Sequence, residues 1–313
     1  MRKRSLGKTG LDVSELALGT WGLSGDAYGP VADAEVDRTI DRALAVGITL
    51  FDTADVYGRG EMERRLGKRL QGAGTTYVVT KIGTDLEESP PRKRFDRPHL
   101  WTAFERSQER LKRDVLDVVL LHNPTVATVG RPEPVEFLKD LKKQGKIRAW
   151  GVSAGNADVA RAAIRNEADV VELAYNVFVA GDLHEVAGDV SESGVGVLAR
   201  SVLAHGLLAG QWSAEREFYP GDHRMERWTP TELRQRVKQL DVLRPLVSGP
   251  VVSVRAAALR FVLANQLVSA AVLGPRTVGQ LDQLVREAGM PPYLRDTALS
   301  DLSTRLRKLG VLS

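Results

Sequence analysis

The sequence contains no cysteine in its 313 residues. That absence excludes disulfide bonds, thiolate nucleophiles, iron–sulfur clusters and zinc sites built from cysteine. Histidine is scarce as well, with five in the chain, and no two of them have the spacing of a metal-binding pair. His184, for example, is followed by "EVAG" and lacks the second histidine of a zinc-protease helix. We therefore expect no bound metal.

Long apolar segments and a strong excess of one charge are missing too. No stretch approaches the ~18 apolar residues that cross a bilayer, and no unbroken apolar run follows the basic start "MRKRSLGKTG". We expect a cytoplasmic protein without a membrane partner. The 44 basic residues nearly match the 40 acidic ones, so we expect no nucleic-acid partner either. The basic run "PPRKRFDRPH" is interpreted as a solvated loop.

What the sequence does contain is a repeated pair of elements. Short apolar runs recur, and each is followed by a longer segment with helical spacing. Eight runs predict strands: "ELALGTW", "ITLFDTA", "TYVVTKI", "VLDVVLLH", "KIRAWGVS", "DVVELAYN", "GVGVLARS" and "SAAVLG". Between the first two, "DAEVDRTIDRALAVG" has Val36, Ile40, Ala43 and Leu44 on one stripe, which is typical of an amphipathic helix.

Eight strand-helix units predict an α/β fold, a closed (β/α)8 TIM barrel. Runs such as residues 115–121 do not alternate polar and apolar, as expected for parallel strands covered on both faces. We predict a single domain over residues 1–313. Before the first unit, "RSLGKTGLDVSEL" predicts a hairpin that caps the bottom of the barrel. At the other end, "PYLRDTALSDLSTRLRKLG" predicts one extra helix.

Polar residues close five consecutive strands of the predicted barrel. They are Asp52, Lys81, His122, Ser153 and Asn176, and Tyr57 lies in the loop after Asp52. Three long segments, residues 84–99, 123–134 and 211–230, follow the third, fourth and seventh strands. Active sites of such barrels lie where the strands end, so we expect these residues to converge there. Taken singly, a strand-end aspartate or histidine is more often structural, and Asn176 is equally a candidate turn cap.

Asp, Tyr, Lys and His without a metal or thiol indicate proton transfer to a carbonyl oxygen. A phenol such as Tyr57 holds its proton at neutral pH and needs help to give it up. Lys81 would stabilise the phenolate, Asp52 would keep Lys81 charged, and His122 could hydrogen-bond the substrate oxygen. The protein itself has no hydride donor, so a nicotinamide cofactor is implied.

These residues resemble those of the aldo-keto reductase family. The likeness rests on "FDTADVYGRGEMERRLG", "TK" at residues 80–81, "LLHNP" and "GVS", and it extends over nearly the whole chain. The resemblance implies a barrel that binds NADP(H), with NAD(H) as the less favoured cofactor. It also implies a catalytic tetrad of Asp52, Tyr57, Lys81 and His122, in which Tyr57 is the proton donor.

The resemblance also assigns residues to the cofactor. They are Thr20, Trp21, Asp52, Ser153, Glu172, Arg200, Ser201, Leu203, Gly206, Gly274, Arg276 and Gln280. Several positions depart from the family pattern. Glu172 stands where glutamine is usual, Ala154 where asparagine commonly follows Ser153, and Arg200 where an aromatic residue often stacks on nicotinamide. Arg276 is expected to pair with a 2′-phosphate, although Gln280 and Leu284 replace the arginine and asparagine of many relatives.

The substrate and the exact role remain open in the sequence. We expect a small carbonyl or sugar substrate, with Trp21, Trp212 and Trp228 as candidates for its pocket. Arg59, Arg92, Arg94, His205 and His223 are either contacts for a polyol or anionic group or surface residues. The alternatives are an aldolase with a Schiff base on Lys81 and a nicotinamide-binding regulatory or sensor subunit with little turnover. The oligomeric state cannot be read from the sequence.

Overall fold

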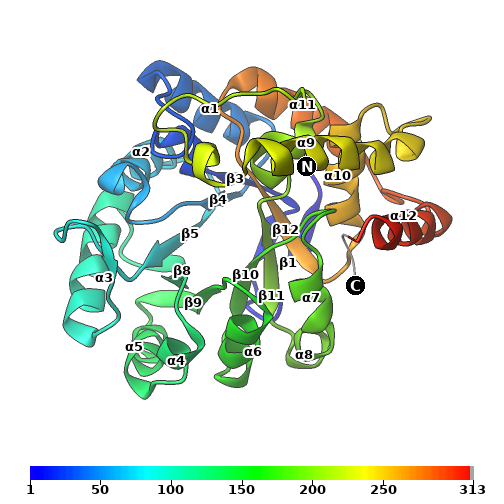
Figure 1. Cartoon of the computed structure of the whole chain (residues 1–313). Helices are drawn as coiled ribbons and strands as arrows, with labels where there is room; N and C mark the ends of the chain where they lie inside the picture. The colour runs from blue at the N-terminus through cyan, green and yellow to red at the C-terminus, as the bar shows by residue number, and fades with distance from the viewer. Residues whose placement is uncertain (311–313) are drawn as a thin grey trace.

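A closed barrel of eight parallel strands forms the centre of the computed structural model, which describes residues 1–310. The strands follow one another around the barrel in sequence order, and the last pairs with the first. They are β3 Leu16–Gly19, β4 Leu50–Asp52, β5 Tyr77–Ile82, β8 Leu116–His122, β9 Ile147–Ser153, β10 Val170–Ala174, β11 Gly196–Arg200 and β12 Val268–Leu273. All eight predicted strands and the barrel are therefore confirmed (Figure 1).

Helices surround the barrel and cover the outer faces of its strands (Figure 1). They are α1 Asp33–Ala45, α2 Glu61–Arg69, α3 Arg97–Leu111, α5 Pro132–Lys143, α6 Ala157–Arg165, α7 Gly181–Glu185, α8 Ala187–Ser193, α10 Val254–Ala264 and α11 Val278–Ala288. A further helix, α9 Pro230–Gln239, packs against the turn formed by Leu240–Leu246. The predicted stripe on α1 is buried at Val36, Ile40 and Ala43. Side chains at the helix starts accept hydrogen bonds from backbone N–H groups that would otherwise lack partners. Asn156 does so for α6 and Ser253 for α10.

The predicted hairpin lies beneath the barrel. Strands β1 Lys3–Ser5 and β2 Asp12–Ser14 pair antiparallel, and Leu6 and Leu11 join the apolar cluster that fills the barrel interior. At Gly7 the backbone has a φ of 51°, and a Cβ there would lie 2.2 Å from the backbone nitrogen of Gly196, so no larger residue fits. The hairpin thus closes the end at which β11 begins.

The three long segments carry short elements of their own. The first holds the two-stranded sheet of β6 Thr84–Asp85 and β7 Arg92–Lys93, and the second holds α4 Val126–Val129. In the third, residues His223–Glu226 form a 3-10 turn. Further 3-10 turns are Trp21–Leu23, Tyr57–Gly60, Ala204–Ala209 and Leu240–Leu246. These segments follow β5, β8 and β11, as predicted.

The extra C-terminal helix is confirmed as α12 Asp296–Lys308, outside the ring of helices (Figure 1). Its Leu302 and Leu306 are buried in a second apolar cluster with Leu243 and Ala257, apart from the main core. Within residues 1–310, no helix is both long and apolar enough to cross a membrane.

Candidate active site

Polar residues form the top layer of the barrel interior because strand side chains alternate between two faces. Below them, inward-facing residues such as Leu50, Val79 and Leu120 belong to one buried apolar cluster. A residue two positions further along a strand points the same way. In six of the eight strands, all but β3 and β12, that position is polar: Asp52, Lys81, His122, Ser153, Glu172 and Arg200 follow Leu50, Val79, Leu120, Gly151, Val170 and Leu198. The strand order therefore brings these residues together above an apolar floor.

Lys81 is buried between two carboxylates. Its Nζ donates to Asp52 Oδ2 at 2.5 Å and to the carbonyl of Thr53 at 3.1 Å, and Glu172 Oε2 lies 3.5 Å away. Burial opposes its charge, but the two carboxylates outweigh burial and raise the pKa of Lys81 above its usual value. Burial and the neighbouring Glu172 raise the pKa of Asp52 to about 7. The ammonium of Lys81 therefore stays charged, and two carboxylates lie beside this single positive charge.

Tyr57 begins the turn that follows β4 and reaches back over the strand ends. Gly58 and Arg59 have left-handed backbone angles, with φ of 58° and 52°, which lets the chain reverse before α2. The Tyr57 ring centroid lies 5.5 Å from Lys81 Nζ and 6.0 Å from the ring of His122, edge to face. Burial raises the pKa of Tyr57 above its usual range, while Lys81 counteracts that rise. The phenol therefore keeps its proton at neutral pH beside a group that stabilises its anion.

His122 is a neutral imidazole at the end of β8. Burial, together with the positive charges of Lys93 and Lys81, lowers the pKa of His122 well below its usual value. Its Nδ1 is buried and has no hydrogen-bond partner among the described residues. A neutral ring can hydrogen-bond a substrate oxygen without adding a positive charge.

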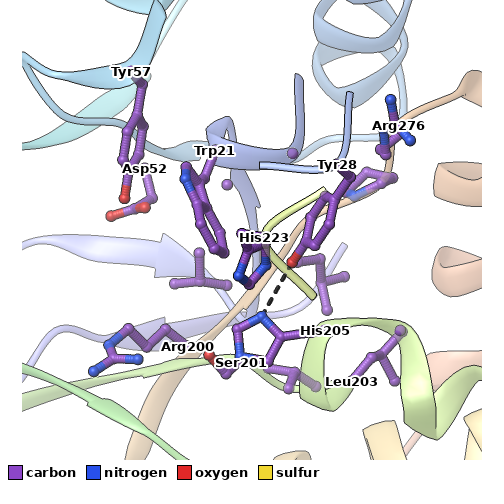
Figure 2. Close-up of a pocket in the computed structure, with 18 of the residues that line it drawn as sticks. Trp21, Tyr28, Asp52, Tyr57, Arg200, Ser201, Leu203, His205, His223 and Arg276 are labelled. Atoms are coloured by element: carbon purple, nitrogen blue, oxygen red, sulfur yellow. Dashed lines mark hydrogen bonds between the residues drawn. The ribbon is translucent and has the colours of Figure 1, made fainter. Parts of the chain in front are cut away.

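A cavity of about 1050 Å³ opens above these four residues. It extends to Arg276, beyond the end of β12 (Figure 2). Every predicted catalytic or cofactor residue lines it except Thr20. Thr20 is completely buried, and its backbone N–H and its side chain both donate to the carbonyl of Asp52, at 2.9 and 3.1 Å. It therefore stabilises the end of β4 and does not itself line the cavity.

Asn176 and Arg276 each hold a loop in place. Asn176 is a turn cap, because its Oδ1 accepts the N–H groups of Phe178 and Val179. Its Nδ2 donates to the carbonyl of Ser201 at 2.9 Å, which fixes a cavity-lining residue whose φ is 57°. At the far end, Arg276 donates to the carbonyls of residues 29 and 30, at 2.8 and 3.0 Å.

An aromatic and histidine cluster joins two loops over the middle of the cavity (Figure 2). Tyr28 Oη and His205 Nδ1 are 3.2 Å apart, and the backbone N–H of His223 donates to the carbonyl of Ala27 at 3.0 Å. The rings of Trp21 and His223 lie 4.7 Å apart. The sequence had left His205 and His223 open between substrate contact and surface; both line the cavity, as Arg59 does, whereas Arg92 and Arg94 do not.

Sequence reasoning missed Tyr28, Arg224 and Arg227, which also line the cavity. Tyr28 lies in the loop of residues 20–32 between the first strand and α1, which exceeds the usual length of about 2–6 residues, so loop length was a signal that could have indicated it. Arg224 and Arg227 fall within the long segment 211–230. The sequence therefore identified their loop, but it did not indicate that these two side chains line the cavity. Of the three tryptophans proposed for a substrate pocket, Trp21 and Trp212 line the cavity, while Trp228 packs edge to face against Trp212.

The cavity is strongly cationic. Its basic lining residues are Arg59, Lys81, Arg200, Arg216, Arg224, Arg227, Arg255 and Arg276, and its acidic ones are Asp26, Asp52 and Glu172. Carboxylates already hold some of these cations, as Asp222 holds Arg224 and Glu287 holds Arg255. An excess of positive charge in an elongated cavity favours an anionic ligand.

Comparison with known proteins agrees with this geometry. The model of the Aldo/keto reductase family matches residues 15–291. The aldo-keto reductase YhdN of Bacillus subtilis is 30% identical over 300 residues, covering 92% of this chain and 89% of that protein. A probable voltage-gated potassium channel subunit beta of Oryza sativa is 26% identical, covering 94% and 93%. The solved glycerol dehydrogenase AKR11B4 of Gluconobacter oxydans superposes with a TM-score of 0.84 at 26% identity, covering 99% and 97%.

Proposed function

The chain belongs to the aldo/keto reductase family, and from this premise we propose that it reduces a small aldehyde or ketone, or oxidises the corresponding alcohol, with NADP(H) as the hydride carrier and Tyr57 as the proton donor. Family membership makes the protein an oxidoreductase that acts between carbonyl compounds and alcohols. The observation that carries the finer proposal is the convergence of Tyr57, Lys81 and His122 at one end of the cavity.

Each member of the tetrad has a distinct role in the proposed reaction. The Tyr57 hydroxyl gives its proton to the carbonyl oxygen, and Lys81 stabilises the phenolate that remains. Asp52 holds the ammonium in place at 2.5 Å. Neutral His122 hydrogen-bonds the substrate oxygen and orients the carbonyl. A bound reduced nicotinamide supplies the hydride that the protein lacks.

Two observations support a phosphate-bearing nicotinamide cofactor, and the family generally uses nicotinamide cofactors. The cavity is long and cationic. Buried polar atoms without a hydrogen-bond partner in residues 1–310 lie toward both of its ends, including Glu172 Oε2 and Arg200 Nε near the tetrad and Arg276 Nε at the far end. In this proposal Arg276 pairs with a 2′-phosphate, which makes NADP(H) the preferred cofactor.

The other predicted cofactor residues fall into three groups along the cavity. Ser153, Glu172 and Arg200 would hold the nicotinamide end. Ser201, Leu203 and Gly206 would hold the pyrophosphate, with Trp21 on the opposite wall (Figure 2). Gly274 and Gln280 would lie with Arg276 at the adenosine end.

A small carbonyl, polyol or sugar is the proposed substrate. Trp21 and Trp212 give the cavity apolar walls, and Arg59, His205 and His223 give it polar ones. A pocket of this mixed character suits a polyhydroxy substrate. The similarity to a protein named glycerol dehydrogenase supports the same class.

That residues 1–313 form one domain stays a prediction.

The aldolase alternative is disfavoured by the state of Lys81. A Schiff base forms from a neutral amine, whereas Lys81 is held by two carboxylates that raise its pKa. A regulatory role is the second candidate, because the chain is also similar to a protein named as a potassium channel subunit. A regulator would bind the cofactor but turn over slowly with every carbonyl tried.

The test combines NADPH oxidation with cofactor binding. Wild type and Tyr57→Phe are assayed against a panel of aldehydes, ketones and sugars, and NADPH binding to both is measured by fluorescence. We expect the variant to bind NADPH as wild type does and to lose at least 100-fold in kcat, since general acid catalysis contributes about 10²–10⁴-fold. Unchanged turnover in the variant would refute the role of Tyr57. Binding without turnover in wild type would favour the regulatory role.

A further inference from the structure

Two side chains of opposite charge, the buried Glu172 and the half-buried Arg200, stand at the ends of neighbouring strands. Glu172 belongs to β10 and Arg200 to β11, and both line the cavity beside Lys81. The strands pair in parallel, with Glu172 opposite Leu198. Arg200 therefore lies two residues further along its strand, on the same face and closer to the mouth of the barrel. Each side chain keeps a buried atom that has no hydrogen-bond partner within residues 1–310, Oε2 of Glu172 and Nε of Arg200.

Neither charge is needed to complete the tetrad. Asp52 already meets the ammonium of Lys81 at 2.5 Å, so the carboxylate of Glu172, at 3.5 Å, is an additional negative charge. Arg200 donates to the carbonyl of Ala154 at 3.1 Å and forms no ion pair with a described carboxylate. Burying a charged group is unfavourable unless other charges compensate it. Glu172 and Arg200 add one negative and one positive charge beside the tetrad, so together they leave its net charge unchanged, although no ion pair joins them.

This balance matters for a ligand whose own charge changes during the reaction. An oxidised nicotinamide ring is a cation, and a reduced ring is neutral. The hydride must reach the carbon of the same carbonyl group whose oxygen Tyr57 protonates, so the ring has to lie within a few ångströms of Tyr57. That part of the cavity is the one that Glu172 and Arg200 line. A charge there acts on the oxidised ring and hardly on the reduced ring.

Building on the proposed function, we propose that Glu172 and Arg200 form an opposing pair that sets the relative affinity of the site for oxidised and reduced nicotinamide. Glu172 strengthens binding of the oxidised form, and Arg200 weakens it. In wild type the two effects largely cancel. Both are specificity-determining residues for the redox state of the cofactor, and they act without taking part in proton transfer.

The experiment measures the dissociation constants of NADP⁺ and NADPH for wild type, Glu172→Gln, Arg200→Gln and the double variant. We expect Glu172→Gln to weaken NADP⁺ relative to NADPH by about tenfold, and Arg200→Gln to shift the ratio by about tenfold the other way. The double variant should return to within about threefold of wild type. A tenfold change in this ratio moves the midpoint potential of the bound two-electron couple by about 30 mV.

Arg276→Gln is the matched control. It removes the same charge from the far end of the cavity (Figure 2), where the ligand is equally charged in both oxidation states. It should weaken NADP⁺ and NADPH by the same factor and leave their ratio unchanged. Circular dichroism of each variant checks that the fold is intact.

The outcomes separate this inference from the proposal on which it rests. If wild type binds neither cofactor, the proposed function fails. If both cofactors bind but the ratio stays within twofold of wild type in Glu172→Gln and Arg200→Gln, the opposing pair is refuted while the proposed function stands. A shift in the same direction in both single variants would also overturn it, because opposite charges cannot have the same effect on a cation.

Discussion

Replacing Lys81 with methionine tests how much one buried ammonium stabilises the two carboxylates beside it at the strand ends. The substitution keeps most of the side-chain length but removes the charge. Asp52 Oδ2 and Glu172 Oε2, which lie 2.5 and 3.5 Å from Nζ, would then be two buried carboxylates without a cation between them. All three side chains are at most 5% exposed, so solvent does little to screen the loss.

The expected destabilisation at alkaline pH is about 3–5 kcal/mol, the usual cost of removing one partner from a buried ion pair. A Coulomb estimate has the same size. At the 3.5 Å between Lys81 Nζ and Glu172 Oε2, an effective dielectric constant of ~20 gives an attraction of about 5 kcal/mol. A loss of this size is a large share of the stability of a typical domain, about 5–15 kcal/mol.

The destabilisation should depend on pH. In wild type, burial and Glu172 already raise the pKa of Asp52 to about 7, and removing the ammonium raises it further. A carboxyl whose folded pKa is raised contributes stability that is fully present below its unfolded pKa and is lost as pH rises through the folded pKa. The variant should therefore lie within about 2 kcal/mol of wild type at pH 5.5 and show the full loss at pH 8.5.

Urea unfolding followed by tryptophan fluorescence at the two pH values measures the effect. The double variant Lys81→Met with Glu172→Gln should regain part of the loss, since it removes one of the repelling charges. Lys139→Met is the control, because the partners of Lys139 are exposed glutamates and surface ion pairs contribute about 0–1 kcal/mol. If Lys81→Met matches this control at pH 8.5, or if its destabilisation is the same at both pH values, the reasoning is wrong.

Two further substitutions address a buried acid and the cofactor phosphate. Burial, with Glu63 nearby, raises the pKa of Asp55 to about 8, so wild type should lose about 1 kcal/mol of unfolding free energy per pH unit between roughly pH 5 and 8 from this group. Asp55→Asn should flatten that slope and be the more stable form at pH 9, and parallel urea-unfolding curves against pH would contradict the assignment. Arg276→Gln should weaken NADPH by at least about tenfold, since a charge-assisted hydrogen bond contributes about 1.5–3 kcal/mol, and leave NADH nearly unchanged. Equal losses of affinity for the two cofactors would remove Arg276 as the 2′-phosphate partner.

The sequence alone was enough to predict the barrel and the residues gathered at its mouth. Apolar runs and helical stripes depend on local spacing, which can be read without knowing the fold. Once eight parallel strands are accepted, their ends must be neighbours, whatever the length of the loops between them. Asp52, Lys81 and His122 therefore had to converge, and the structure brings them together with Tyr57 as expected.

Contacts between distant segments were decided only by the tertiary structure. Tyr28 and His205 are 177 positions apart, and nothing in either local sequence predicts that they meet. Thr20 was assigned to the cofactor, yet it packs beneath the cavity wall because its hydroxyl reaches the backbone of Asp52. The charge balance between Glu172 and Arg200 was equally invisible, because it depends on burial. The sequence determines which residues point into a barrel because side-chain alternation is local, whereas loop packing and the energy of a buried charge depend on groups that only the folded chain brings together.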